Sequence, residues 1–100
     1  MISRSIKETI VEFNNHAAGF YAYLFDQLSA SVQKLDRKKE ENVFKLQVSK
    51  YIEELKRQLD QQAQGLLDTQ DSTIRKQLES VLPRIVNYYL QEFMLKCNSL

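Results

Sequence analysis

The only histidine of the chain, His16, follows Glu8 by eight residues and Glu12 by four. Groups four residues apart lie on one face of a helix, so one imidazole and two carboxylates could approach a common point. Such a set is typical of metal binding or acid–base catalysis, but a zinc site needs more ligands than these three provide. A helical projection at about 100° per residue places His16 on a polar face with Tyr23 and Lys34. We therefore expect a surface histidine and no metal site.

The remaining chemistry-bearing residues do not form a recognisable catalytic pattern. Cys97 is the only cysteine, so it cannot form an intramolecular disulfide, and we expect a buried free thiol in a cytoplasmic protein. With two glycines in the whole chain there is no glycine-rich phosphate loop. Serine, threonine and aspartate residues cannot be distinguished here from helix caps and polar surface. We expect no enzymatic activity, no cofactor and no small-molecule substrate.

A basic cluster within residues 34–50 is a candidate nucleic-acid surface. Its members are Lys34, Arg37, Lys38, Lys39, Lys45 and Lys50. Aromatic Phe44 and Tyr51 are interleaved with these cations, which is a weak form of the pattern that binds nucleic-acid backbones. Glu40 and Glu41 offset part of the charge, and a formal net charge of +1 gives no bulk attraction for a polyanion. The competing interpretation is a solvated turn or helix end.

The most apolar and aromatic stretch of the chain runs over residues 82–97, LPRIVNYYLQEFMLKC. At about 100° per residue its apolar groups cover most of a helix circumference, whereas a surface helix needs only one apolar face. The excess predicts neighbours on several sides or a partner chain. A membrane span is excluded because polar residues interrupt a run already shorter than the roughly 20 residues that a bilayer requires.

A protein interface is therefore predicted on this stretch and on one flank of an earlier helix. Its residues are Tyr21, Phe25, Tyr88, Tyr89, Glu92, Phe93, Leu95 and Lys96. Glu92 and Lys96 are four residues apart and either pair with each other at a solvent edge or mark the rim of an aromatic interface. Ala18 and Ala22 lie beside the first two aromatic residues and would permit the close approach of another helix.

Three apolar stripes with helical spacing predict three long helices. The first helix begins near Ser5, where Ser5 and Glu8 form a capping box, and its stripe runs from Ile6 to Leu35. The second stripe runs over residues 44–66, with Gly65 in the last turn of that helix. The third helix contains Pro83, which is expected to bend or restart it and to re-aim its apolar face.

Two polar segments are predicted to connect these helices. Residues 36–42, DRKKEEN, contain no apolar residue, and the stripes before and after them differ in phase by about 145°. A turn here lets both stripes share one core, although the absence of glycine and proline leaves a continuous helix as the alternative. The second segment is DTQDST, in which Asp68, Asp71 or Ser72 can cap the third helix.

The sequence thus predicts an all-α, antiparallel bundle of three long helices, kinked at Pro83, that occupies residues 1–100 as one domain. The composition, 43% hydrophobic and 27% charged, is that of a globular protein. An elongated helical hairpin that completes its core only as a dimer is the alternative. We expect a non-enzymatic interaction module, meaning a small subunit, adaptor or chaperone-like partner. Its partner is a different protein or a second copy, in a homodimer or larger assembly. The alternative function is an accessory subunit that binds a nucleic-acid backbone.

Overall fold

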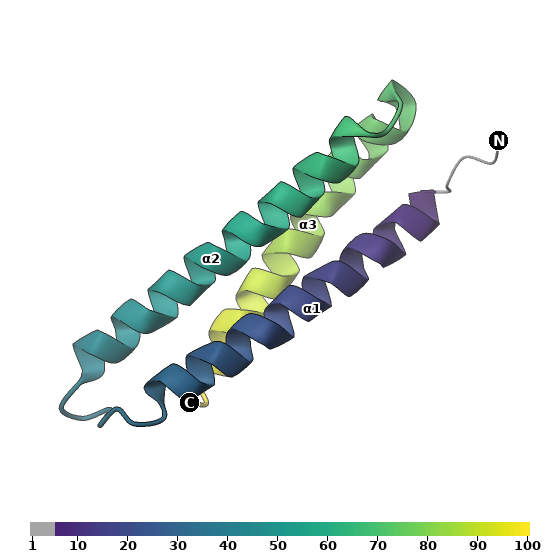
Figure 1. Cartoon of the computed structure of the whole chain (residues 1–100). Coiled ribbons are helices and arrows are strands. Elements are labelled where there is room, and N and C mark those ends of the chain that lie inside the picture. Colours follow the sequence, from purple (N-terminus) through teal and green to yellow (C-terminus); the bar gives the residue numbers. More distant parts are fainter. Residues whose placement is uncertain (1–5) are drawn as a thin grey trace.

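Three α-helices joined by two short turns make up the computed structural model, which describes residues 6–100 (Figure 1). The helices are α1 (Ile6–Val32), α2 (Glu41–Asp68) and α3 (Ser72–Cys97). Each helix packs against both others, and no strand occurs within residues 6–100. The predicted all-α bundle of three long helices is confirmed.

The chain reverses direction at each turn, so the C-terminus lies beside the end of α1 (Figure 1). Tyr89 contacts Asn14 and Phe93 contacts Phe25, so α1 and α3 run side by side in the same direction. The Cα radius of gyration is 16.3 Å, against about 13 Å for a compact domain of this length. With extents of 58 × 17 × 17 Å the molecule is a rod with a thin core.

The buried apolar side chains form one cluster along the rod. They are Phe13, Ala17, Leu24, Leu28, Val32, Phe44, Leu55, Leu59, Leu78, Leu82, Val86, Phe93 and Cys97. Each helix contributes residues at spacings of four, seven or eleven, which place them on one side of the helix. Further apolar side chains that are only partly buried pack around this cluster. The core is therefore one narrow column shared by three helices.

The turn between α1 and α2 is confirmed, and it forms without glycine or proline. The Asp36 carboxylate accepts hydrogen bonds from the backbone N–H groups of Lys38 and Lys39, at 3.0 and 3.4 Å. The Glu40 carboxylate accepts one from the backbone N–H of Asp36, at 3.0 Å. Side chains thus satisfy the backbone donors of a short turn, as in a helix cap.

Asp71 caps the N-terminus of α3. Its carboxylate accepts hydrogen bonds from the backbone N–H groups of Thr73 and Ile74, both at 3.0 Å. Of the three candidate caps in this segment, Asp71 is the one that the structure selects. The capping box predicted at the start of α1 depends on Ser5, which lies outside the described residues.

Gly65 and Pro83, residues of low helix propensity, both lie inside helices. Gly65 lies within α2, three residues before its end, as predicted. Pro83 lies inside α3, which is one uninterrupted helix from Ser72 to Cys97, so the helix does not restart there. The bend expected at Pro83 stays a prediction.

The thin core predicts a sharp contrast between two leucines of α2. Leu55 is completely buried and Leu46 is 70% exposed. We expect Leu55→Ala to lower the free energy of unfolding by about 2–5 kcal/mol because it leaves a cavity in the column. The control Leu46→Ala should change it by less than about 0.5 kcal/mol. Urea unfolding followed by circular dichroism measures both, and equal effects would contradict the described core.

Candidate interaction surface

Four aromatic side chains form a seam between α1 and α3. The ring of Phe93 packs edge-to-face against Tyr21 and Phe25, with centroid distances of 5.8 and 5.9 Å. Tyr21 packs in the same manner against Tyr89, at 5.8 Å. Such pairs contribute about 0.5–1.5 kcal/mol each beyond the burial of their area. Two surfaces that the sequence analysis treated as separate sites of association thus meet each other within one chain.

Phe93 requires a correction to the predicted interface. Its side chain is 0% exposed, so it belongs to the core and cannot be the centre of a surface. Tyr21, Phe25 and Tyr89 are partly buried against the core, and they retain only part of their surface for a partner. The physical reason is the α1–α3 contact itself, because the α1 flank covers the α3 residues that it was expected to leave free.

Lys96 lies over the aromatic seam. Its ammonium nitrogen is 4.4 Å from the ring centroid of Phe25 and 5.5 Å from that of Tyr21, in cation–π contact. Glu92 lies close enough to influence the same tyrosine. The pKa of the Tyr21 hydroxyl is raised above its usual value, chiefly by burial and then by the negative charge of Glu92. Both charges therefore border the seam.

Tyr89 is anchored by a hydrogen bond as well as by its ring contacts. Its hydroxyl donates to Oδ1 of Asn14 at 2.9 Å, which connects α3 to α1 beyond the ring contacts. The neighbouring Tyr88 contacts the edge of the same ring, with a centroid distance of 5.3 Å. Burial raises the pKa of Tyr89, and the hydrogen bond with Asn14 opposes that rise. Tyr89 is thus a structural residue of the seam.

The apolar surface that the seam leaves exposed lies on the outer side of α3. Tyr88 is 58% exposed and Leu95 is 64% exposed. We define the α3 outer stripe as the half-buried Val81 and the exposed Arg84, Tyr88, Glu92 and Leu95, whose spacings of three, four, four and three residues keep them on one side of the helix. Val81 and Arg84 were not among the interface residues predicted from the sequence. Their spacing from Tyr88 was the signal that could have identified them.

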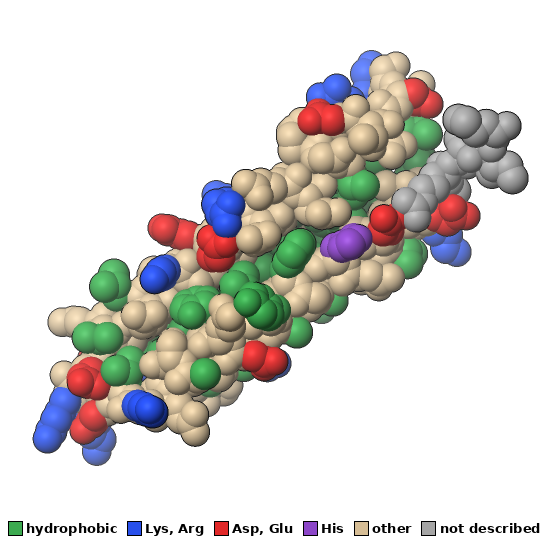
Figure 2. Space-filling view, in the orientation of Figure 1, with side chains coloured by type: hydrophobic (Ala, Val, Ile, Leu, Met, Phe, Trp, Pro, Cys, Tyr) green, Lys and Arg blue, Asp and Glu red, His purple; other side chains and the backbone are tan. Residues whose placement is uncertain are grey.

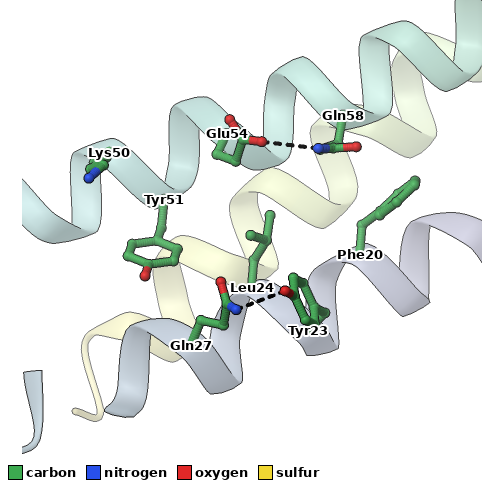
Figure 3. Close-up of a pocket in the computed structure, with 8 residues that line it drawn as sticks. All are labelled: Phe20, Tyr23, Leu24, Gln27, Lys50, Tyr51, Glu54 and Gln58. Atoms are coloured by element: carbon green, nitrogen blue, oxygen red, sulfur yellow. Dashed lines mark hydrogen bonds between the residues drawn. The ribbon is translucent and has the colours of Figure 1, made fainter. Parts of the chain in front are cut away.

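A groove of about 510 Å³ lies between α1 and α2 (Figure 3). Phe20 and Tyr23 of α1 and Tyr51 of α2 provide aromatic walls, and Tyr51 extends from α2 toward α1. Figure 2 shows apolar side chains gathered along the line where these two helices meet. Gln27 donates a hydrogen bond to the Tyr23 hydroxyl at 2.8 Å, which holds that exposed ring. The lining of the groove combines aromatic rings with polar side chains, among them Gln27, Lys50 and Gln58.

The carboxylate in this groove is already engaged by its own helix. Glu54 accepts hydrogen bonds from Arg57 and, at 3.0 Å, from Gln58. The bond with Arg57, followed by the bond with Gln58, lowers the pKa of Glu54 to about 2. Glu54 is therefore ionised at neutral pH, and a low pKa makes it a poor general base.

Two cations of the basic segment 34–50 have partners within the chain. The Arg37 guanidinium lies over the ring of Phe44, 4.1 Å from its centroid, and donates to the backbone oxygen of Leu100. Lys45 is 3.3 Å from a carboxylate oxygen of Glu41. Both cations thus have partners within the chain.

The other basic side chains are separated by the fold. Lys50 lines the α1–α2 groove. Lys34, Lys38 and Lys39 are exposed around the first turn, as is Arg37. Arg37 and Lys45 thus have partners within the chain, and binding of nucleic acid by the predicted cluster of six stays a prediction.

The histidine and the cysteine occupy the environments that the sequence predicted. His16 is exposed, and its Nε2 atom is 3.9 Å from Oε1 of Glu12. Cys97 is a buried free thiol, and burial raises its pKa to about 11, which keeps it protonated and poorly reactive at neutral pH. Within residues 6–100, no group of three or more His, Cys, Asp or Glu residues is arranged to hold a metal ion. No helix in the same range is long and apolar enough to cross a bilayer.

Comparisons of the chain with protein-family models, with curated proteins and with solved structures found no match.

The low pKa of Glu54 predicts a pH-dependent stability difference. Its folded pKa of about 2 lies below the value of about 4.3 expected in the unfolded chain, so its contribution is present above pH 4.3 and is lost as the pH falls toward 2. We expect Glu54→Gln to be less stable than the wild type at pH 7 and equally stable near pH 2. Arg57→Gln, which removes the main donor, should reproduce this trend. Urea unfolding at several pH values tests it, and a pH-independent gap would contradict it.

The hydrogen bond of Tyr89 predicts a difference between adjacent tyrosines. Tyr89→Phe removes the hydroxyl that binds Asn14, and we expect the free energy of unfolding to fall by about 0.5–1 kcal/mol. Tyr88→Phe is the matched control, since it removes a hydroxyl from an exposed ring and should leave stability unchanged. Thermal unfolding at low protein concentration measures both. A larger loss of stability in Tyr88→Phe than in Tyr89→Phe would contradict the role given to the Tyr89 hydroxyl.

Proposed function

We propose that this chain is a non-enzymatic interaction module, meaning a small subunit, adaptor or chaperone-like partner. It acts by burying the α3 outer stripe against another chain. The observation that carries the proposal is the exposure of Tyr88 and Leu95 after the other aromatic residues of α3 have been used in the seam. Tyr88 and Leu95 belong, with Met94, to the apolar side chains of α3 that the bundle leaves exposed.

The composition of the stripe supports an interface role. Burying a leucine side chain contributes about 1.5–3 kcal/mol, and tyrosine is enriched among the residues that dominate binding energy. Tyr88 is held in place by its contact with Tyr89, so little conformational freedom is lost when a partner covers it. Arg84 and Glu92 give the stripe charged positions around this apolar centre, as is common in protein interfaces.

The proposal assigns no catalytic role to the chain. Several charged groups of the helix surfaces are engaged in local pairs, such as Arg75 with Glu79 at 3.4 Å and Glu54 with Arg57. The proposal also places the chain in the cytoplasm, where a lone buried thiol such as Cys97 is in a compatible redox environment.

Binding to a nucleic-acid backbone is the second candidate function. The observation that favours it is the exposure of Lys34, Lys38 and Lys39 around one turn. Sequence-independent affinity grows with the number of phosphates neutralised, so three lysines would give weak, salt-sensitive binding. We rank it below the protein interface because Arg37 and Lys45 have partners within the chain.

A photo-crosslinking experiment tests the interface. A photoreactive phenylalanine analogue is placed at Tyr88, at Leu95 or, as a control, at Glu53, which is exposed on α2. After irradiation of cells in which the chain is native, we expect a discrete covalent adduct from positions 88 and 95 and none from position 53. The absence of a discrete adduct at both α3 positions, or the same adducts at all three positions, would contradict the proposal.

A further inference from the structure

In the α3 outer stripe the residues are spaced symmetrically on either side of Tyr88, and the charged residues on the two sides have opposite signs. Arg84 and Glu92 lie four residues on either side of Tyr88, and Val81 and Leu95 lie seven residues on either side. Reversing the direction of the helix about Tyr88 therefore exchanges a cation with an anion and an apolar residue with an apolar residue. A surface with this property is complementary to itself across a two-fold axis.

We infer that the partner of the α3 outer stripe is a second copy of this chain, with the two α3 helices antiparallel and the two-fold axis at Tyr88. This inference rests on the proposed function. In that arrangement Arg84 of each copy faces Glu92 of the other, so the ion pair forms twice. Val81 faces Leu95 of the second copy, also twice, and the two Tyr88 rings meet on the axis.

One chain cannot satisfy these charges by pairing them with each other. Arg84 and Glu92 are eight residues apart, which is about 12 Å along the helix. An ion pair requires a nitrogen–oxygen distance of about 4 Å or less. An antiparallel second copy removes that separation, because its Glu92 is brought opposite Arg84.

Other ways of pairing two α3 helices are disfavoured by charge. A parallel pair would place Arg84 opposite Arg84 and Glu92 opposite Glu92, and like charges in contact oppose association. An antiparallel pair shifted by one helical turn would place Arg84 opposite Lys96. The register centred on Tyr88 converts both charged positions into attractive contacts.

The adjacent face of α1 leaves room for the second copy. Phe25 contacts α3, and Ala18 and Ala22 precede it by seven and three residues, so all three lie on the side of α1 that borders α3. Both alanines are exposed and small. A helix packed on the α3 outer stripe therefore meets short side chains at this edge, which permits a close approach.

Reversal of the two charges tests the inference. Sedimentation equilibrium over a concentration series compares the untagged full chain with Arg84→Glu, with Glu92→Arg and with the double variant carrying both changes. Each single variant places like charges opposite each other twice, and we expect its dimer dissociation constant to rise about tenfold. The double variant restores both attractions, and its dissociation constant should return to within about threefold of the wild type. Circular dichroism must show the same helix content in all four proteins, and the same melting temperature at a concentration low enough for all four to be monomeric.

Two results would overturn the inference. One is a wild-type chain that stays monomeric at all concentrations, and the other is a dimer whose dissociation constant does not respond to the reversals or is not restored in the double variant. The photo-crosslinking experiment distinguishes this failure from failure of the proposed function. An adduct between Tyr88 and a different protein would support the interaction module and contradict a second copy as its partner. The absence of any adduct would contradict both proposals.

Discussion

The packing of Phe93 against α1 is the contact on which the arrangement of the α3 surface depends. A helix whose circumference is mostly apolar can rotate about its axis and still bury apolar side chains. The edge-to-face contacts of Phe93 with Tyr21 and Phe25 fix that rotation. Once Phe93 points inward, helical spacing places Tyr89 on the α1 side and directs Tyr88 outward.

The thin core explains why this contact matters. A rod of three helices has a single column of buried side chains, so much of its apolar surface is only partly covered. The seam covers one part of the apolar excess of α3, while Lys96 covers the rings of Tyr21 and Phe25 on α1. The α3 outer stripe lies outside the seam. Its charges are arranged so that a second copy of the same surface is a complementary partner.

The sequence was sufficient for the helices and their connections because both are local properties. The phase difference between apolar stripes predicted the first turn although residues 36–42 contain neither glycine nor proline. In the structure, the carboxylates of Asp36 and Glu40 accept hydrogen bonds from backbone N–H groups of this turn. Such reasoning could not predict which face of α3 points inward, because apolar residues cover most of its circumference and their spacing favours no single face. Phe93 was assigned to the surface for this reason.

Proximity along the chain was also a poor guide to a shared surface. Lys45 and Lys50 are five residues apart, and helical geometry separates them by about 140° around α2. Lys45 pairs with Glu41, whereas Lys50 lines the α1–α2 groove. A composition-based basic patch on a helix must therefore be tested by projection. By that test the residues of the α3 outer stripe lie on one side of their helix, whereas Lys45 and Lys50 lie on different sides of theirs.

The central claim is that the seam buries one set of tyrosines and leaves Tyr88 for a second copy. Photo-CIDNP NMR reports the solvent accessibility of each tyrosine, so a dilution series followed by this method tests the claim most directly. We predict that Tyr23 and Tyr88 give strong signals in dilute samples, that Tyr21 and Tyr89 give weak ones, and that the Tyr88 signal alone falls as concentration rises. Strong signals from Tyr21 and Tyr89 at any concentration, or a Tyr88 signal that never changes relative to Tyr23, would contradict the account.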